Sequence, residues 1–184
     1  MTGLGAIFRI FGAAIAFTLA LAGASHARGL NDAEKASLSA TVSDFNGAIK
    51  SANIDRISQT VPPRIFDLLA KKSNVDAAVI RETMLQLLKS ALEEAPFEAF
   101  SMDVQNAAFK ETPQGEPYAL IPTEVALAID GKRFKVSTHT LALIDGETWY
   151  LVRVSEQQQI ALLREAYPNF VAEEFPESRT EALN

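Results

Sequence analysis

The chain has 184 residues, of which 48% are hydrophobic and 22% charged, a composition typical of one globular domain. Its formal net charge of -6 at pH 7, without a run of basic residues, argues against a protein that binds nucleic acid or an anionic membrane surface. The absence of cysteine excludes disulfides, thiol nucleophiles, thiolate metal ligands and acylation of a cysteine.

The first 27 residues have the pattern of a cleavable export signal. One cation, Arg9, precedes an apolar run over 10–24, and small residues fit signal-peptidase cleavage after Ala24 or Ala27. The alternative, an uncleaved anchor, would need about 20 apolar residues, more than this run provides. We therefore expect a periplasmic or secreted protein with no membrane segment after cleavage, and a charge of about -7 because Arg9 is lost.

The mature chain is expected to begin with a helix after Asn31. Asn31 and Glu34 have the spacing of a capping box, in which each side chain accepts a hydrogen bond from the backbone amide of the other residue. The helix should present one apolar stripe, because hydrophobic residues then recur every three or four positions: Leu38, Val42, Phe45 and Ile49.

Two more helical segments should follow. A short helix over 54–61 must end before Pro62 and Pro63, because proline lacks the amide proton and disfavours helix in the residue before it. Pro63 can open the next turn, which carries the apolar residues Ile65, Phe66, Leu68 and Leu69. A longer helix capped by Ser73 or Asn74 should then run to Pro96, with this buried face: Val75, Val79 or Ile80, Met84, Leu87 or Leu88, and Leu92.

From Phe97 onward the hydrophobic period changes from helical to two, which indicates strands at about 98–111, 117–130, 132–144 and 147–154. Turns at 114–115, 130–131 and 145–146 separate them, and the last two are Asp-Gly pairs, a strong signal for tight hairpins. The last three strands should therefore form an antiparallel meander.

A final helix is expected after Ser155, which has Gln158 at the capping-box spacing and an apolar stripe of Ile160, Leu163 and Tyr167. The acidic segment 172–184 is expected to be a loose tail. Helices before strands predict one α+β domain over 28–171, with helices on a curved antiparallel sheet.

This order of elements, ending in Asp145–Val154 (DGETWYLVRV), resembles the nuclear transport factor 2-like superfamily, which includes SnoaL-like polyketide cyclases and ketosteroid isomerases. The resemblance covers 31–154 and implies a cone-shaped fold, a four-stranded sheet wrapped on helices with a pocket at its wide end. Many members place a hairpin between their helices, whereas 63–95 is helical throughout in this chain. The aspartate and tyrosine of the isomerases match no motif position here, and a fold does not transfer an activity.

The register of the meander follows if both Asp-Gly turns are two-residue loops. Ile129 then faces Lys132, and Ile144 faces Glu147. One face should carry an apolar block, and we expect it to be the concave face toward the helices: Val125, Leu127, Phe134 and Val136. The same face also carries Thr123, Thr138, Thr140, Trp149 and Arg153.

In this register Thr123, Thr138 and Arg153 lie in one row across three strands. Two hydroxyls and a guanidinium beside Trp149 could orient a small anionic ligand in an otherwise apolar pocket, with Thr140 nearby. The alternative is that Arg153 is solvated at the sheet edge, that the threonines serve strand propensity, and that Trp149 is part of the core.

Two residues are candidates for a catalytic base. His139, with Glu124 one diagonal step away, could be a general base oriented by a carboxylate, or an ordinary polar pair on the outer face. Asp103 could be a base if its face lines the cone, with Tyr118 as a hydroxyl donor, or could lie on a solvated face with Ser101 and Gln105. A single histidine supplies too few ligands for a zinc site, so no metal is expected. No cofactor is expected either.

The opposite face of the sheet is too apolar to face solvent, because it carries Leu141, Leu143, Tyr150 and Val152. Either the final helix or a second copy should cover it, which would make a homodimer through this face. Three functions stay open. They are a non-catalytic binding or accessory protein for a small apolar or amphipathic ligand, an isomerase-like or cyclase-like enzyme using Asp103 or His139, and an envelope interaction module that uses the outer face.

Overall fold

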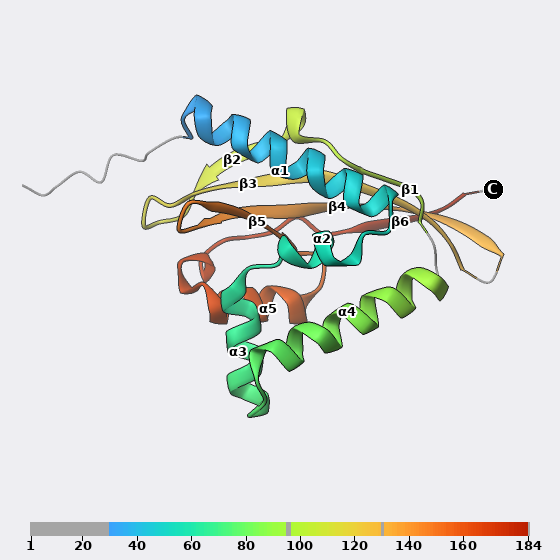
Figure 1. Cartoon of the computed structure of the whole chain (residues 1–184). Coiled ribbons are helices and arrows are strands. Elements are labelled where there is room, and N and C mark those ends of the chain that lie inside the picture. The colour runs from blue at the N-terminus through green and yellow to red at the C-terminus, as the bar shows by residue number, and fades with distance from the viewer. Residues whose placement is uncertain (1–29, 95–96, 130, 184) are drawn as a thin grey trace, which may run out of the picture.

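The computed structural model describes residues 30–94, 97–129 and 131–183. The expected export signal over 1–27 lies outside the described residues. Helices pack against a curled antiparallel sheet that forms half of a barrel (Figure 1). The predicted α+β class is therefore confirmed, and the arrangement is compatible with a nuclear transport factor 2-like fold. No helix in the described ranges has the length and apolarity needed to cross a bilayer.

Helix α1 spans Asp32–Lys50 and begins as the sequence predicts. The side chain of Asn31 accepts from the amide of Glu34, and the Glu34 carboxylate accepts from the amide of Asn31, both at 2.9 Å. Leu38 and Val42 are buried, which confirms the expected stripe.

The short helix α2 spans Ile54–Gln59, α3 spans Pro63–Ser73 and α4 spans Ala77–Glu94. The expected cap of α4 at Ser73 or Asn74 is wrong. Asn74 instead ends α3 in the left-handed conformation, with φ of 53°, which asparagine tolerates better than most residues. The carboxylate of Asp76 accepts from the amide of Ala78 at 2.7 Å, so α4 begins after Asp76.

The expected buried face of α4 is also wrong, because α4 contains no buried residue. Ile80, Met84, Leu88 and Leu92 are only half-buried, whereas Val75, Val79 and Leu87 are exposed. The reason is tertiary, since α4 packs against α2 and α3 and runs toward the end of the sheet at which β1 begins (Figure 1).

The single strand expected over 98–111 is broken into two. Strand β1 spans Phe97–Met102 and β2 spans Ala108–Glu111, with a 3-10 turn at Val104–Asn106 between them. The carboxylate of Asp103 accepts from the amides of Gln105 and Asn106, both at 3.2 Å, and this local competition with the ladder ends β1.

Strand β3 spans Pro117–Ile129, β4 spans Lys132–Asp145 and β5 spans Thr148–Arg153, in the sheet order β1-β3-β4-β5. Strand β2 also pairs with β3. Ile129 lies opposite Lys132, so the predicted register of the first hairpin is confirmed.

The predicted register of the second hairpin is wrong by two residues. Asp145 still belongs to β4 and pairs with Thr148, so the loop is Gly146-Glu147 and Arg153 lies opposite Thr140. Gly146 takes the positive φ of 66° that this turn needs. Because side chains alternate with a period of two, a shift of two residues leaves every side chain on its predicted face.

Both faces of the sheet are covered over β5 and the adjoining halves of β3 and β4. On one face, Leu38 and Val42 of α1 pack with Ile121, Trp149 and other residues of a first core. On the other face, α3, α5 and the segment after α5 pack over a second core that includes Leu141, Leu143 and Val152. The final helix and α3 therefore cover the outer face.

The carboxy-terminal segment differs from prediction at both ends. Helix α5 spans Gln157–Ala166, and its N-cap, Glu156, makes no capping bond, so the expected capping box at Ser155 is absent. The expected loose tail over 172–184 is wrong as well. Phe175 packs against the second core, and Arg179–Leu183 forms strand β6, which pairs with β4.

Candidate functional site

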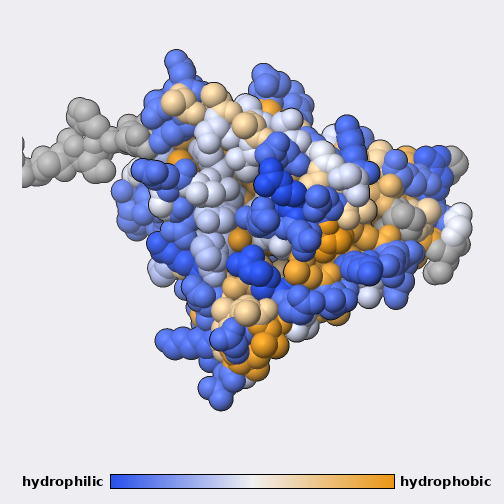
Figure 2. Space-filling model, viewed as in Figure 1, coloured by the Kyte–Doolittle hydropathy of each residue, from blue (hydrophilic) through white to orange (hydrophobic). Residues whose placement is uncertain are grey.

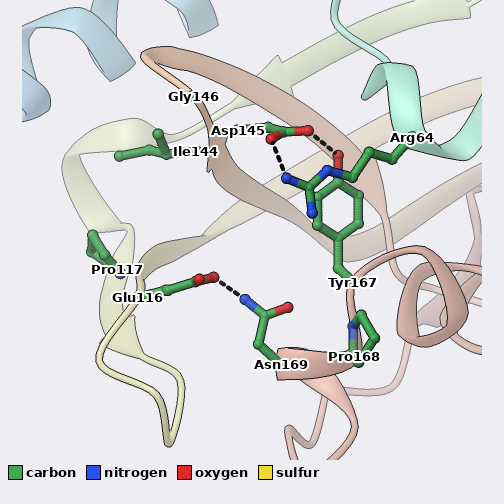
Figure 3. Close-up of a pocket in the computed structure, with 9 residues that line it drawn as sticks. All are labelled: Arg64, Glu116, Pro117, Ile144, Asp145, Gly146, Tyr167, Pro168 and Asn169. Atoms are coloured by element: carbon green, nitrogen blue, oxygen red, sulfur yellow. Dashed lines mark hydrogen bonds and ion pairs between the residues drawn. The ribbon is translucent and has the colours of Figure 1, made fainter.

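A pocket of about 460 Å³ lies where the β4-β5 turn meets α3 and the end of α5. Arg64 forms an ion pair with Asp145 at 2.9 Å, and the hydroxyl of Tyr167 donates to the other carboxylate oxygen of Asp145 at 2.8 Å. The Arg64 guanidinium also lies 5.1 Å from the centre of the Tyr167 ring. Figure 3 shows Arg64 and Tyr167 converging on Asp145, with Glu116 and Asn169 paired across the pocket.

The polar groups of this pocket are bonded to one another. Burial, and then the hydrogen bond to Asp145, raise the pKa of Tyr167, so its hydroxyl stays a donor at neutral pH. Burial and the bond to Glu173 likewise raise the pKa of Tyr118. We interpret the group formed by Arg64, Asp145 and Tyr167 as a structural clasp, because both carboxylate oxygens of Asp145 are already bonded, whereas a general base needs an accessible acceptor.

The row expected from Thr123, Thr138 and Arg153 is not formed. Thr123 does lie opposite Thr138, but Arg153 pairs with Thr140 because of the shift at the second turn. The Arg153 side chain is 60% exposed and bonds to Ser155 at 2.5 Å.

The threonine hydroxyls bond within the protein. Thr123 and Thr140 share a hydrogen bond of 2.8 Å, and Thr138 shares one of 2.9 Å with Ser178. Their role in binding a ligand stays a prediction.

Trp149 belongs to the first core. Its side chain is buried among residues that pack under α1, and its indole nitrogen donates to the backbone oxygen of Glu34 at 3.1 Å. Trp149 also lines a hollow of about 180 Å³, together with residues of α1 and α2.

Asp103 is placed as a cap. Its carboxylate also accepts from the side chain of Asn106 at 2.7 Å, and this bond is the main cause that holds the pKa of Asp103 below its usual value. A carboxylate that is exposed and has a lowered pKa is a poor general base. Of the two predictions made for Asp103, the one that places it on a solvated face fits this geometry.

His139 lies opposite Pro122 on the outer face, at a hollow of about 410 Å³ beneath the segment that leads to β6. Burial lowers its pKa, so the imidazole is neutral at pH 7, and its Nδ1 has no hydrogen-bond partner among the described residues. Glu124, the expected partner, forms an ion pair with Lys135 at 2.7 Å. No described residue of this face therefore orients His139 as a base.

An incompletely covered apolar area lies at the end of the sheet near the first hairpin, on the same face as α1. We call it the open apolar surface, and its residues share this face in the observed register: Phe97, Val125, Leu127, Ile129, Phe134 and Val136. None of them is buried, and Ile129 is 49% exposed. These include the block that the sequence places against the helices, so α1 covers less of the sheet than expected.

Helix α4 brings a second apolar stripe to this end of the sheet. Its last residue, Glu94, is three positions before Phe97, so the end of α4 lies near the start of β1. Figure 2 shows hydrophobic side chains gathered between α4 and the strands.

Sequence reasoning missed the clasp and the open apolar surface. Arg64 and Asp145 are 81 residues apart, and no local pattern links them. The open surface depends on which part of an apolar face receives a helix, which periodicity does not encode. Among the residues that the structure describes, no three histidine or acidic side chains gather as a metal site would require.

Comparisons with protein-family models, with curated proteins and with solved structures find no match to this chain.

Proposed function

We propose that this chain is an exported, non-catalytic binding protein of the nuclear transport factor 2-like type. Its ligand is a small amphipathic molecule with an apolar body and an acidic head, held between α4 and the open apolar surface. The proposal places the mature protein in the periplasm or outside the cell.

The observation that carries the proposal is the lack of cover on the apolar stripe of α4 and on the open apolar surface. A helix of 18 residues with an apolar stripe and no buried residue leaves hydrophobic area in water. Each buried methylene group stabilises by about 0.8 kcal/mol, so an apolar chain inserted there would gain free energy from both sides.

Charge at the rim favours an acidic head group. Lys132 is exposed, pairs with Ile129 at the tip of the hairpin, and shares the face of the open apolar surface. It forms no ion pair within the described part of the chain. A ligand carboxylate or phosphate could therefore bond to its ammonium group without breaking an existing pair.

The alternative functions receive less support from the geometry. An enzyme of the isomerase type would need a positioned base, whereas Asp103 is a cap and His139 has no orienting partner in the described ranges. An interaction module built on Leu141 would need that side chain to be accessible, but Leu141 is fully buried under the second core.

Native mass spectrometry of the protein from its producing cell can first detect a bound ligand. Binding of a fluorescent long-chain fatty acid to the mature protein then tests the proposal. Ile129→Asp should weaken binding by about tenfold or more, because a charge would lie beside the apolar chain. Val171→Asp is the matched control, since Val171 is 61% exposed beyond α5 and outside the open apolar surface.

A second variant distinguishes the contribution of the ligand's acidic head group from that of its apolar body. Lys132→Glu should weaken binding of the fatty acid but leave binding of the corresponding long-chain alcohol unchanged, because only the acid carries a charge. Equal loss of binding in Ile129→Asp and Val171→Asp would exclude the open apolar surface as the site.

A further inference from the structure

Strand β6 occupies a separate part of the β4 edge. Residues Arg179–Leu183 pair antiparallel with Arg133–Ser137, while β5 pairs with the part of the same edge from Thr140 onward. Within the described residues, β6 is therefore the one strand that covers the edge at Arg133–Ser137. An uncovered edge of this kind is a template for another strand.

On one face, β6 fits its neighbour poorly. Thr180 lies opposite Val136 and Ala182 lies opposite Phe134. Both residues of β6 are exposed, and Phe134 and Val136 stay half-buried. Cross-strand pairs of large apolar or aromatic residues stabilise a sheet, and these two positions lack that stabilisation.

The other face of the pairing is basic on β4. Glu181 lies opposite Lys135, and Leu183 lies opposite Arg133. Lys135 and Arg133 also bond to Glu124 and Glu98, each at 2.7 Å. Lys135 therefore favours an acidic residue at the opposite position of any strand that pairs here, as Glu181 is in β6.

The segment before β6 is anchored independently of it. Phe175 packs against the second core, and the Ser178 hydroxyl bonds to Thr138. The strand can thus leave the edge while the chain up to Ser178 keeps its contacts.

We propose that the β4 edge at Arg133–Ser137 docks an extended segment of another protein, and that β6 is a resident strand which this segment displaces. The docked segment would place large apolar residues opposite Val136 and Phe134 and an acidic residue opposite Lys135. The partner differs from this chain, because β6 of a second copy would bring the same Thr180 and Ala182 and gain nothing. The inference does not depend on the proposed function.

The test uses the whole mature chain and a fluorescent peptide of residues 177–184 with Thr180→Ile and Ala182→Leu. In the releasing variant, Glu181→Pro/Ala182→Pro, one of the two prolines removes an amide donor toward β4, because successive amides of a strand point to opposite sides. The releasing variant should bind the peptide about tenfold more tightly than the parent chain. In the parent, β6 occupies the edge, and the apparent affinity is reduced in proportion to the fraction of molecules whose edge is open.

Two matched controls define the site. A chain that itself carries Thr180→Ile/Ala182→Leu should bind the peptide more weakly than the parent, because its resident strand holds the edge better. A peptide with Glu181→Lys should bind the releasing variant more weakly at low salt, because its charge then repels Lys135.

In the releasing variant, hydrogen exchange should show new protection of amides within 133–137 when the peptide binds. Equal affinity of the parent and the releasing variant, or protection elsewhere on the sheet, would overturn the proposal. Dimerisation of the parent chain that the two prolines abolish, together with no affinity of the releasing variant for the peptide, would also overturn it, because the strand would then be exchanged between copies.

Discussion

The indole Nε1 of Trp149 donates a hydrogen bond to the backbone oxygen of Glu34 across 3.1 Å, which ties β5 to the first turn of α1. Trp149 is the single tryptophan of the chain and is almost fully buried. The contact fixes the amino-terminal helix on the sheet through a residue of the terminal hairpin.

Trp149→Phe should destabilise the protein by about 2 kcal/mol, because phenylalanine leaves a cavity and loses the hydrogen bond of the indole. Urea unfolding followed by circular dichroism measures this loss, since the variant has no tryptophan emission. Glu147→Gln, in the exposed turn nearby, is the control and should change stability little. Equal stability of the two variants would mean that the indole contributes nothing to the attachment of α1.

The clasp at Asp145 should contribute to stability through Tyr167. Tyr167→Phe removes the bond to the carboxylate, and a hydrogen bond to a charged group typically contributes about 1.5–3 kcal/mol. Tyr150→Phe removes a hydroxyl from a half-buried tyrosine of β5 and is expected to cost less. Chemical denaturation of both variants compares them, and a larger loss in Tyr150→Phe would contradict the clasp.

Asp103 should act as a cap that tolerates asparagine. Asp103→Asn keeps an oxygen that can accept from the amides of Gln105 and Asn106, whereas Asp103→Ala removes it and should cost about 1 kcal/mol. Thermal unfolding distinguishes the two. If Asp103→Asn were as damaging as Asp103→Ala, the negative charge rather than the hydrogen bonds would be the stabilising feature.

His139 should make stability depend on pH. Burial lowers its pKa in the folded state below the ordinary 6.5, so the unfolded chain binds a proton more readily. The free energy of unfolding is therefore unaffected by this group above about pH 6.5 and falls as the pH drops below that value.

His139→Gln should remove this part of the pH dependence. Denaturant unfolding of both proteins between about pH 5 and 8 measures it. Identical slopes below pH 6.5 in the parent and the variant would show that His139 titrates alike in both states.

The sequence by itself determined the local elements whose causes lie within a few residues. The capping box at Asn31 and Glu34 sets the start of α1, and the Asp-Gly turn after Ile129 sets the register of the first hairpin. Side-chain alternation placed Thr123 and Trp149 on one face even though the second turn shifted, because the shift was an even number of residues.

The tertiary structure alone decided which apolar residues are covered. The stripe of α4 has the period of a buried helix, yet its position beside α2 and α3 leaves Leu87 66% exposed. The tail has the composition of a loose segment, yet the unpaired edge of β4 gives Arg179–Leu183 backbone partners. Burial and edge pairing depend on what approaches from distant parts of the chain, and the period of a segment carries no information about its neighbours.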